Sequence, residues 1–154
     1  GEALLDVGAR RAARDEGGFS WRHATLAQVD GEVAGMVLAY ALPAPEAIAP
    51  DGAPALLQPF IELEREAAPS WYINAFAVHP PFRGRGIGAA LLRRTVADAR
   101  RAGLQHVSVQ YFARNPRAGA FYRRHGFRDA GRRALMRHPA CRYEGDTVLL
   151  IRST

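Results

Sequence analysis

The 154-residue chain contains no lysine, so all 21 of its Lys and Arg positions are arginine. This absence excludes a Walker phosphate loop, which needs Gly-Lys-Ser/Thr. The only cysteine, Cys141, cannot form an internal disulfide. We expect a buried or half-buried thiol there, and a reducing, cytoplasmic location fits this composition.

The longest apolar run, residues 33–42, is about half of the roughly 20 residues that a membrane helix needs, so no membrane partner is expected. No targeting peptide is visible.

Charge and histidine spacing narrow the classes of ligand. The net charge is +6 and the isoelectric point is about 10.4. This balance favours an anionic partner, which could be nucleic acid, phosphate or a nucleotide cofactor. His106, His125 and His138 lack the spacing that would direct them at one metal ion, so we expect no metal.

Length and periodicity predict one domain over residues 1–154, of the α/β (α+β) class, with a mixed, mostly antiparallel central sheet flanked by helices. The Asp30-Gly31 pair indicates a hairpin, and the strand at 70–78 is expected to be buried on both faces. Trp21 and Trp71 are expected in the core. The predicted helices are residues 3–16, 59–67, 87–103 and 115–126, and the predicted strands are residues 22–29, 33–42, 70–78, 104–111, 127–137 and 146–152.

Glycine and arginine alternate at residues 83–88, where the strand at 70–78 leads into a helix. The first turn of a helix has N–H groups without intrahelical partners, and glycine lets an anion approach the backbone. The spacing Gly-x-Gly-x-Gly differs from the dinucleotide-binding Gly-x-Gly-x-x-Gly, and residues 104–114 contain no acid for a ribose. A diphosphate is the ligand that this turn suits. A tight turn with solvated arginines is the alternative.

Two motifs together resemble the GNAT superfamily of N-acetyltransferases. The run from Arg83 to Gly88 matches the signature Arg/Gln-x-x-Gly-x-Gly/Ala that follows the family's fourth strand. Downstream, Asn115, Ala118, Phe121-Tyr122 and Gly126-Phe127 resemble the second motif. The resemblance covers residues 71–127, and the order of elements extends it to 22–151.

The resemblance implies a single-domain GNAT-like fold that binds acetyl-CoA and transfers the acetyl group to an amine by direct attack. Much of the family's first strand and helix is expected to be absent upstream of Ala3, either because the chain is trimmed or because the edge of the sheet is unusual. By position, Tyr122 would contact the cofactor and act as the general acid for the departing thiolate, and Asn115 would contact the pantetheine arm. Core packing on a short helix is the alternative for Phe121 and Tyr122. Phe76 and Val78 would offer main-chain bonds to pantetheine and the thioester carbonyl. The diphosphate would be held by Arg83, Gly84, Arg85, Gly86, Ile87, Gly88 and Ala89.

The sequence departs from the family pattern at the position of the general base. Some family members carry a glutamate where this chain has Tyr72, and residues 70–78 contain no carboxylate. Glu62, Glu64, Asn74 and His79 are candidate substitutes or water-holding groups, although each is also explained as a solvated or structural residue. Glu62, Glu64 and Glu66 would attract a cationic amine if they line the acceptor pocket, and otherwise form a solvated helix face.

Two other interpretations stay open. The arginine clusters suit a basic nucleic-acid-binding module, although interleaved aromatic residues for stacking are lacking. The second interpretation is a GNAT-like protein that binds coenzyme A without catalysis. The acceptor, the acyl-chain preference and the oligomeric state, monomer or homodimer, are left open.

Overall fold

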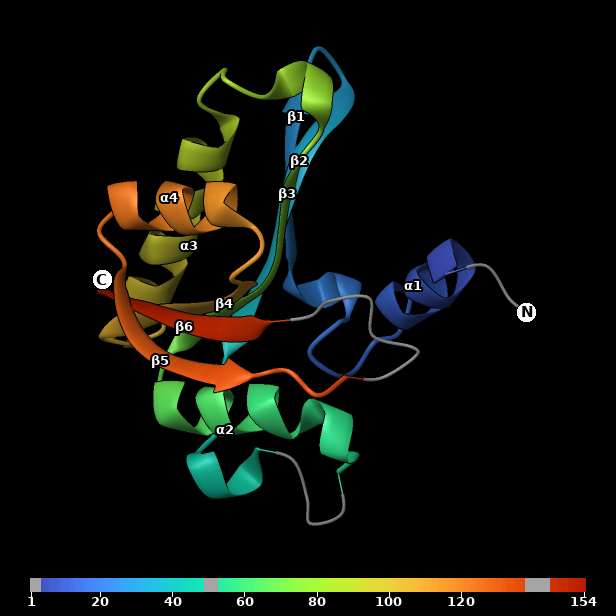
Figure 1. The fold of residues 1–154 in the computed structure, drawn as a ribbon. Coiled ribbons are helices and arrows are strands. Elements are labelled where there is room, and N and C mark those ends of the chain that lie inside the picture. Colours follow the sequence, from blue (N-terminus) through green and yellow to red (C-terminus); the bar gives the residue numbers. More distant parts are fainter. Residues whose placement is uncertain (1–3, 49–52, 138–144) are drawn as a thin grey trace. The chain divides into compact units, whose positions relative to one another are not determined.

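The computed structural model describes residues 4–48, 53–137 and 145–154 (Figure 1). The predictions for Cys141 and His138 lie outside these residues. None of the helices in the described ranges has the length and apolar character that crossing a bilayer requires. The α-helices are α1 Leu4–Ala12, α2 Gln58–Ala67, α3 Ile87–Arg101 and α4 Pro116–Arg124, and the strands are β1 Ala24–Val29, β2 Glu32–Ala41, β3 Trp71–Val78, β4 His106–Phe112, β5 Arg128–Ala134 and β6 Asp146–Ser153.

These strands and helices form the mixed α/β fold with a mostly antiparallel six-stranded sheet that the sequence predicts. By its internal contacts the chain divides into two compact units. The first comprises Gly1–Tyr40 and Ile73–Thr95, and the second comprises Ala41–Tyr72 and Val96–Thr154. The expectation of a single domain stays a prediction.

The first unit is built on the hairpin of β1 and β2, with β3 hydrogen-bonded beside β2. Asp30 and Gly31 have φ angles of 51° and 83°, the left-handed pair that a tight two-residue hairpin requires. Val29 pairs with Glu32 across this turn, which confirms the predicted hairpin. The first turns of α3, which begins at Ile87, also belong to this unit.

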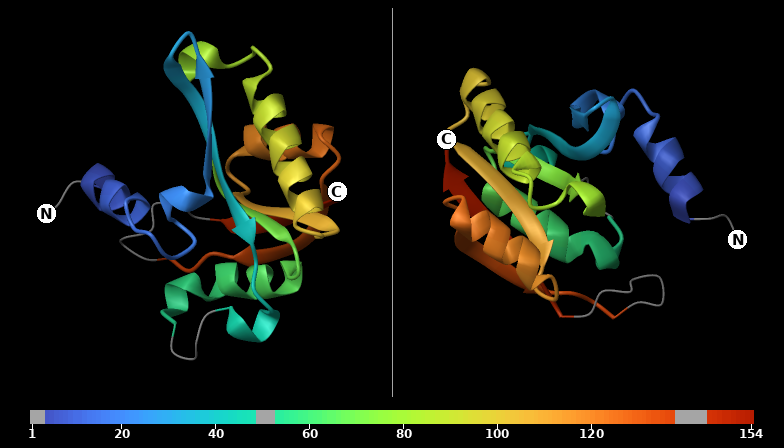
Figure 2. Two further views of the ribbon diagram at one scale, coloured as in Figure 1. Left: turned by 180° about the vertical axis from the view of Figure 1, so that it is seen from behind. Right: turned by 90° about the horizontal axis from the view of Figure 1, so that it is seen from above.

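The second unit contains three antiparallel strands in the order β4-β6-β5. Figures 1 and 2 show α2 on one face of these strands and α4 on the other, so β6 is covered on both sides. The near-continuous apolar run in β6 follows from that position. Val148, Leu149 and Leu150 are each at most 1% exposed.

Two predictions about burial are wrong. β3 is not buried on both faces, because Asn74 and Ala77 are exposed. Trp21 is 54% exposed and lies in a short 3-10 turn before β1, where the Arg22 guanidinium stands 5.0 Å from its ring centroid. Contact with that cation covers part of the indole ring without burying it in the core. Trp71 is half-buried.

Candidate functional site

The turn between β3 and α3 leaves the main chain open to an approaching group. Gly84 and Gly86 have φ angles of 76° and 79°, which favour glycine. A Cβ atom added at either position would meet no atom within 4 Å, so the space above both residues is unfilled. The Ala90 N–H makes a helical bond to the Gly86 carbonyl at 3.0 Å. The amides of residues 86–89 therefore come before the helical bonding pattern starts, at the positive end of the helix dipole.

The two arginines of this turn have different surroundings. Arg83 Nε donates to the Val78 carbonyl at 2.9 Å, so its side chain ties the turn back to the end of β3. The Arg85 guanidinium lies 5.5 Å from the ring centroid of Phe82, and its side chain is exposed. Because Arg83 already engages the Val78 carbonyl, a ligand at Val78 would use the N–H or the second lone pair of that oxygen.

The end of β3 is held firmly against β2. The His79 N–H donates to the Ala34 carbonyl at 2.9 Å, which fixes the main chain of this exposed histidine. At Gly35, an added Cβ would lie 2.8 Å from the Ala77 carbonyl oxygen, so the strands approach too closely for a side chain there. This packing sets the position of the main chain around Phe76 and Val78, the residues that the resemblance assigns to the acyl carrier.

In the second unit, the predicted capping residues position α4. Asn115 caps the helix by accepting from the Ala118 N–H at 3.2 Å, with Pro116 at the first helical position. Because the Asn115 side-chain oxygen is used in this way, its amide nitrogen is the end that would donate to a ligand carbonyl.

The other end of α4 sets the place of Tyr122. Gly126 has a φ angle of 86°, and the Phe127 N–H donates to the Tyr122 carbonyl at 3.2 Å, as in a Schellman cap. The cap brings the Phe127 ring to 5.3 Å from the Tyr122 ring, and Phe121 packs edge-on at the same separation. Tyr122 is 5% exposed, and burial raises the pKa of its hydroxyl well above the usual value of 10.0. The phenol is therefore protonated throughout the neutral range.

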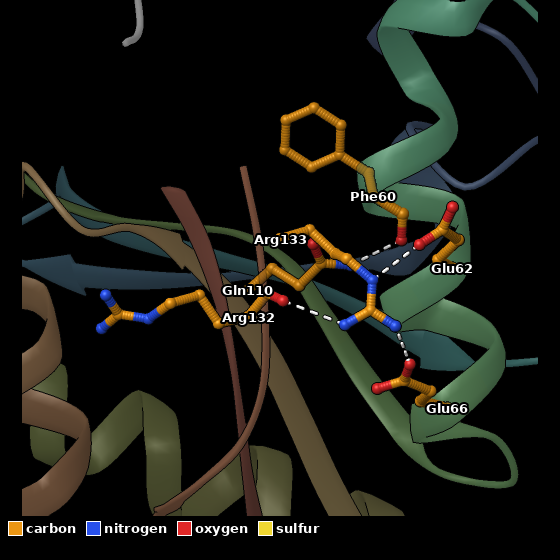
Figure 3. Close-up of polar contacts among 6 residues, drawn as sticks. All are labelled: Phe60, Glu62, Glu66, Gln110, Arg132 and Arg133. Carbon is orange, nitrogen blue, oxygen red and sulfur yellow. Dashed lines mark hydrogen bonds and ion pairs between the residues drawn. The ribbon is translucent and has the colours of Figure 1, made fainter. Parts of the chain in front are cut away.

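The carboxylates of α2 are partly neutralised by β5. Figure 3 shows the Arg133 guanidinium reaching α2, where it contacts both Glu62 and Glu66, while Arg132 points away from that helix. The distance from Arg133 Nε to Glu62 Oε2 is 2.6 Å. The Arg133 guanidinium therefore offsets part of the negative charge of Glu62 and Glu66, and the expectation that they attract a cationic amine stays a prediction.

Glu64 differs from these neighbours because it is half-buried. Burial raises the pKa of its carboxyl above the usual 4.5, and a hydrogen bond with the Tyr72 side chain opposes this shift. Of the two carboxylates among the candidate bases, Glu64 is thus the more buried one.

The structure places the predicted site residues in two groups. Phe76, Val78 and residues 83–89 lie in the first unit, and Asn115 and Tyr122 lie on or at the start of α4 in the second. Sequence reasoning missed a contact in the first unit, in which Asn74 Nδ2 donates to the Tyr40 hydroxyl at 3.1 Å. The only local signal for it is an asparagine inside an otherwise apolar strand, since asparagine is depleted in strands.

Residues 4–127 match the profile of the acetyltransferase (GNAT) family. An uncharacterized N-acetyltransferase of Methanocaldococcus jannaschii is 39% identical over 57 residues, which are 37% of this chain and 25% of that protein. The chain thus spans about a quarter of the length of the curated relative it matches.

Two solved structures share the fold. One, described as an acetyltransferase, has a TM-score of 0.67 at 20% identity, covering 97% of this chain and 79% of that chain. A GNAT family acetyltransferase from Elizabethkingia anophelis with acetyl-CoA bound has a TM-score of 0.58 at 17% identity, covering 85% of this chain and 75% of that chain.

Proposed function

Because the chain belongs to the acetyltransferase (GNAT) family, we propose that it is an N-acetyltransferase that transfers the acetyl group of acetyl-CoA to a primary amine. The acceptor in this proposal is a small molecule or a peptide, and the amine attacks the thioester directly. A cytoplasmic location is part of the proposal. The support comes from the two motifs, from the open glycine turn and from the buried phenol on α4.

The observation that carries the proposal is the unfilled space over Gly84 and Gly86 beside the first amides of α3. A diphosphate placed there would receive main-chain N–H bonds, and such bonds to a charged acceptor are about twice as strong as neutral ones. Arg85 supplies further positive charge, and Arg83 keeps the turn attached to β3. From the resemblance, the proposal assigns main-chain bonds to the pantetheine arm to Phe76 and Val78, and a donated side-chain hydrogen bond to Asn115.

The thioester supplies an activated acetyl group, and the chain's residues would assist its transfer. Negative charge develops on the carbonyl oxygen during attack and on the sulfur during departure. Main-chain N–H groups on β3 would meet the first charge. Tyr122 would donate a hydrogen bond or a proton to the sulfur, because its raised pKa keeps the phenol protonated at neutral pH.

The nucleic-acid alternative receives less support, because several arginines already contact carboxylates. Arg123 Nη2 lies 2.7 Å from Asp129 Oδ1, and Arg132 Nη1 lies 3.0 Å from Asp146 Oδ2. Binding of oligonucleotides that weakens steeply with salt would favour this alternative.

The proposal is tested by thermal unfolding with acetyl-CoA and by thiol release with amines. A ligand at about 100 times its Kd stabilises the native state by about 2.7 kcal/mol, which corresponds to a rise of roughly 5–10 °C in the Tm of a chain of this size. We expect that rise, together with release of coenzyme A in the presence of an amine. A Tm that acetyl-CoA leaves unchanged would contradict the proposal. A rise in Tm without thiol release from any amine would indicate a protein that binds coenzyme A without catalysis.

A further inference from the structure

A polar pair interrupts the apolar strands of the first unit. Asn74 lies in the middle of β3 and is exposed, and its side-chain nitrogen donates to the hydroxyl of Tyr40 on β2 at 3.1 Å. A carboxamide carries its donor and its acceptor on opposite branches. Once the nitrogen is directed to Tyr40, the Oδ1 atom points the other way, with its orientation fixed by the hydrogen bond.

Tyr40 is itself held in place by the segment that precedes β1. The His23 ring lies 5.1 Å from the Tyr40 ring, centroid to centroid. A Cβ atom added at Gly18 would collide with the Tyr40 hydroxyl, so the main chain of Gly18 packs directly against it. Contacts from two sides leave the phenol little freedom to move. The Asn74 amide is therefore preorganised, as binding groups in rigid sites are.

Asn74 also lies on a specific face of β3. Side chains alternate along a strand, so Asn74 shares its face with Phe76 and Val78, and two residues along a strand span about 7 Å. Under the proposed function, the main chain of Phe76 and Val78 holds the acyl carrier. An acceptor group bound at Asn74 would then lie about 7 Å along β3 from Phe76, one of the two residues to which the thioester end of the carrier is assigned.

We propose that Asn74 binds the acceptor amine through its Oδ1 atom and that Tyr40 is the positioning residue that orients the amide. This inference rests on the proposed function. The amine nitrogen donates one N–H to Oδ1, which directs its lone pair to the thioester carbon. The C–N bond forms, the C–S bond breaks with its electron pair on sulfur, and the proton lost by nitrogen balances the proton gained by sulfur. An amide cannot take up a proton, so Asn74 aligns the amine and does not deprotonate it.

A structural role alone would make a different prediction. If the pair only joined β2 to β3, its loss would lower stability and leave the KM for the amine unchanged in the folded enzyme. Amine binding instead predicts an increase in that KM with little change in acetyl-CoA affinity. Loss of one hydrogen bond to the substrate corresponds to roughly a tenfold change.

The chain is suited to a direct spectroscopic test, because it contains only two asparagines, Asn74 and Asn115. Protein labelled with 15N in asparagine side chains gives one side-chain 15N resonance for each of the two residues, and Asn74→Ala assigns them. Coenzyme A alone should shift the Asn115 signal, as the proposed function predicts. The amine is then added to the coenzyme A complex, where no transfer can occur. It is chosen from glycinamide, ethanolamine, spermidine and n-propylamine as the fastest in thiol release with the native enzyme. The Asn74 signal should shift with saturation while the Asn115 signal stays in place.

Kinetics provide the second readout. Asn74→Ala should raise the amine KM roughly tenfold or more, with the Kd for acetyl-CoA within about twofold of the native value. Tyr40→Phe should have a smaller effect in the same direction, because the amide is then free to rotate. Gln28→Ala removes an exposed amide from β1 of the same unit and should change neither constant.

The two proposals fail in different ways. An unshifted Asn74 signal together with an unchanged amine KM in Asn74→Ala would overturn the role of Asn74 while the native enzyme still acetylates amines. If acetyl-CoA changes neither the Tm nor the Asn115 signal, or if no amine in the set releases thiol from the native enzyme, the proposed function itself fails and the inference fails with it.

Discussion

Replacing Gly86 by alanine separates the two reasons for a glycine at the start of α3. Gly86 has a φ angle of 79°, and an added Cβ would meet no protein atom within 4 Å. Gly103, which follows α3, is a matched control, because its φ angle is 73° and its surroundings are equally open. Both substitutions introduce the same left-handed strain without a clash. Only the one at Gly86 places a methyl group where the diphosphate is proposed to bind.

The two variants should lose similar stability, and only Gly86→Ala should lose acetyl-CoA affinity. Left-handed backbone costs an L-residue about 1–2 kcal/mol, and a more restricted unfolded chain returns about 0.4–1 kcal/mol. Each variant should therefore lose about 1 kcal/mol of stability, which is a fall of roughly 2–4 °C in Tm. In Gly86→Ala, one or two charge-assisted bonds to phosphate, worth about 1.5–3 kcal/mol each, are also lost. Affinity for acetyl-CoA should fall at least about tenfold.

Calorimetric titration with acetyl-CoA and unfolding of the ligand-free proteins measure both quantities. We expect similar Tm values for Gly86→Ala and Gly103→Ala, and weakened binding in Gly86→Ala alone. Equal affinities in the two variants would refute the reasoning, because the open space over Gly86 would then have no part in holding the donor.

Three further predictions concern side chains of the second unit. Tyr122→Phe should lower the rate of thiol release about 100-fold or more while acetyl-CoA affinity changes less than about threefold, and full turnover would contradict its role as the acid. Arg133→Ala leaves Glu62 and Glu66 as like charges one helical turn apart, so the Tm of this variant should fall more than that of Arg132→Ala. The difference between the two Tm values should narrow in high salt. Equal Tm values would argue against a stabilising role for the Arg133 contact. Burial raises the pKa of the Glu64 carboxyl, so its contribution to stability is complete below pH 4.5 and is lost as the pH rises through the raised pKa. Glu64→Gln should flatten this fall in the free energy of unfolding, measured in urea from pH 4 to 8. An unchanged pH profile would contradict a raised pKa at Glu64.

Features set by neighbouring residues could be predicted from the sequence. The Asp30-Gly31 turn, the Asn115 cap with Pro116, and the exit of α4 at Gly126 depend on backbone preferences that act within a few residues. The spacing of Leu91, Leu92, Val96 and Ala99 likewise identified the buried face of α3, and all four side chains are less than 9% exposed.

Contacts between distant residues could not be predicted in this way. Arg133 and Glu62 are 71 positions apart, and Asn74 and Tyr40 are 34 apart. Such pairs depend on how strands and helices pack, which periodicity does not specify. Trp21 was predicted in the core because its side chain is large and apolar. It is exposed instead, and the neighbouring Arg22 covers part of its ring.

The central claim is that the amides at the start of α3 hold the phosphate end of the acyl carrier. The most direct test compares the Kd of S-acetyl-4′-phosphopantetheine with that of S-acetylpantetheine, which differs only in lacking the phosphate. The account predicts that the phosphorylated compound binds at least about tenfold more tightly, as expected for one lost charge-assisted bond. Equal affinities of the two compounds for the native protein would contradict it.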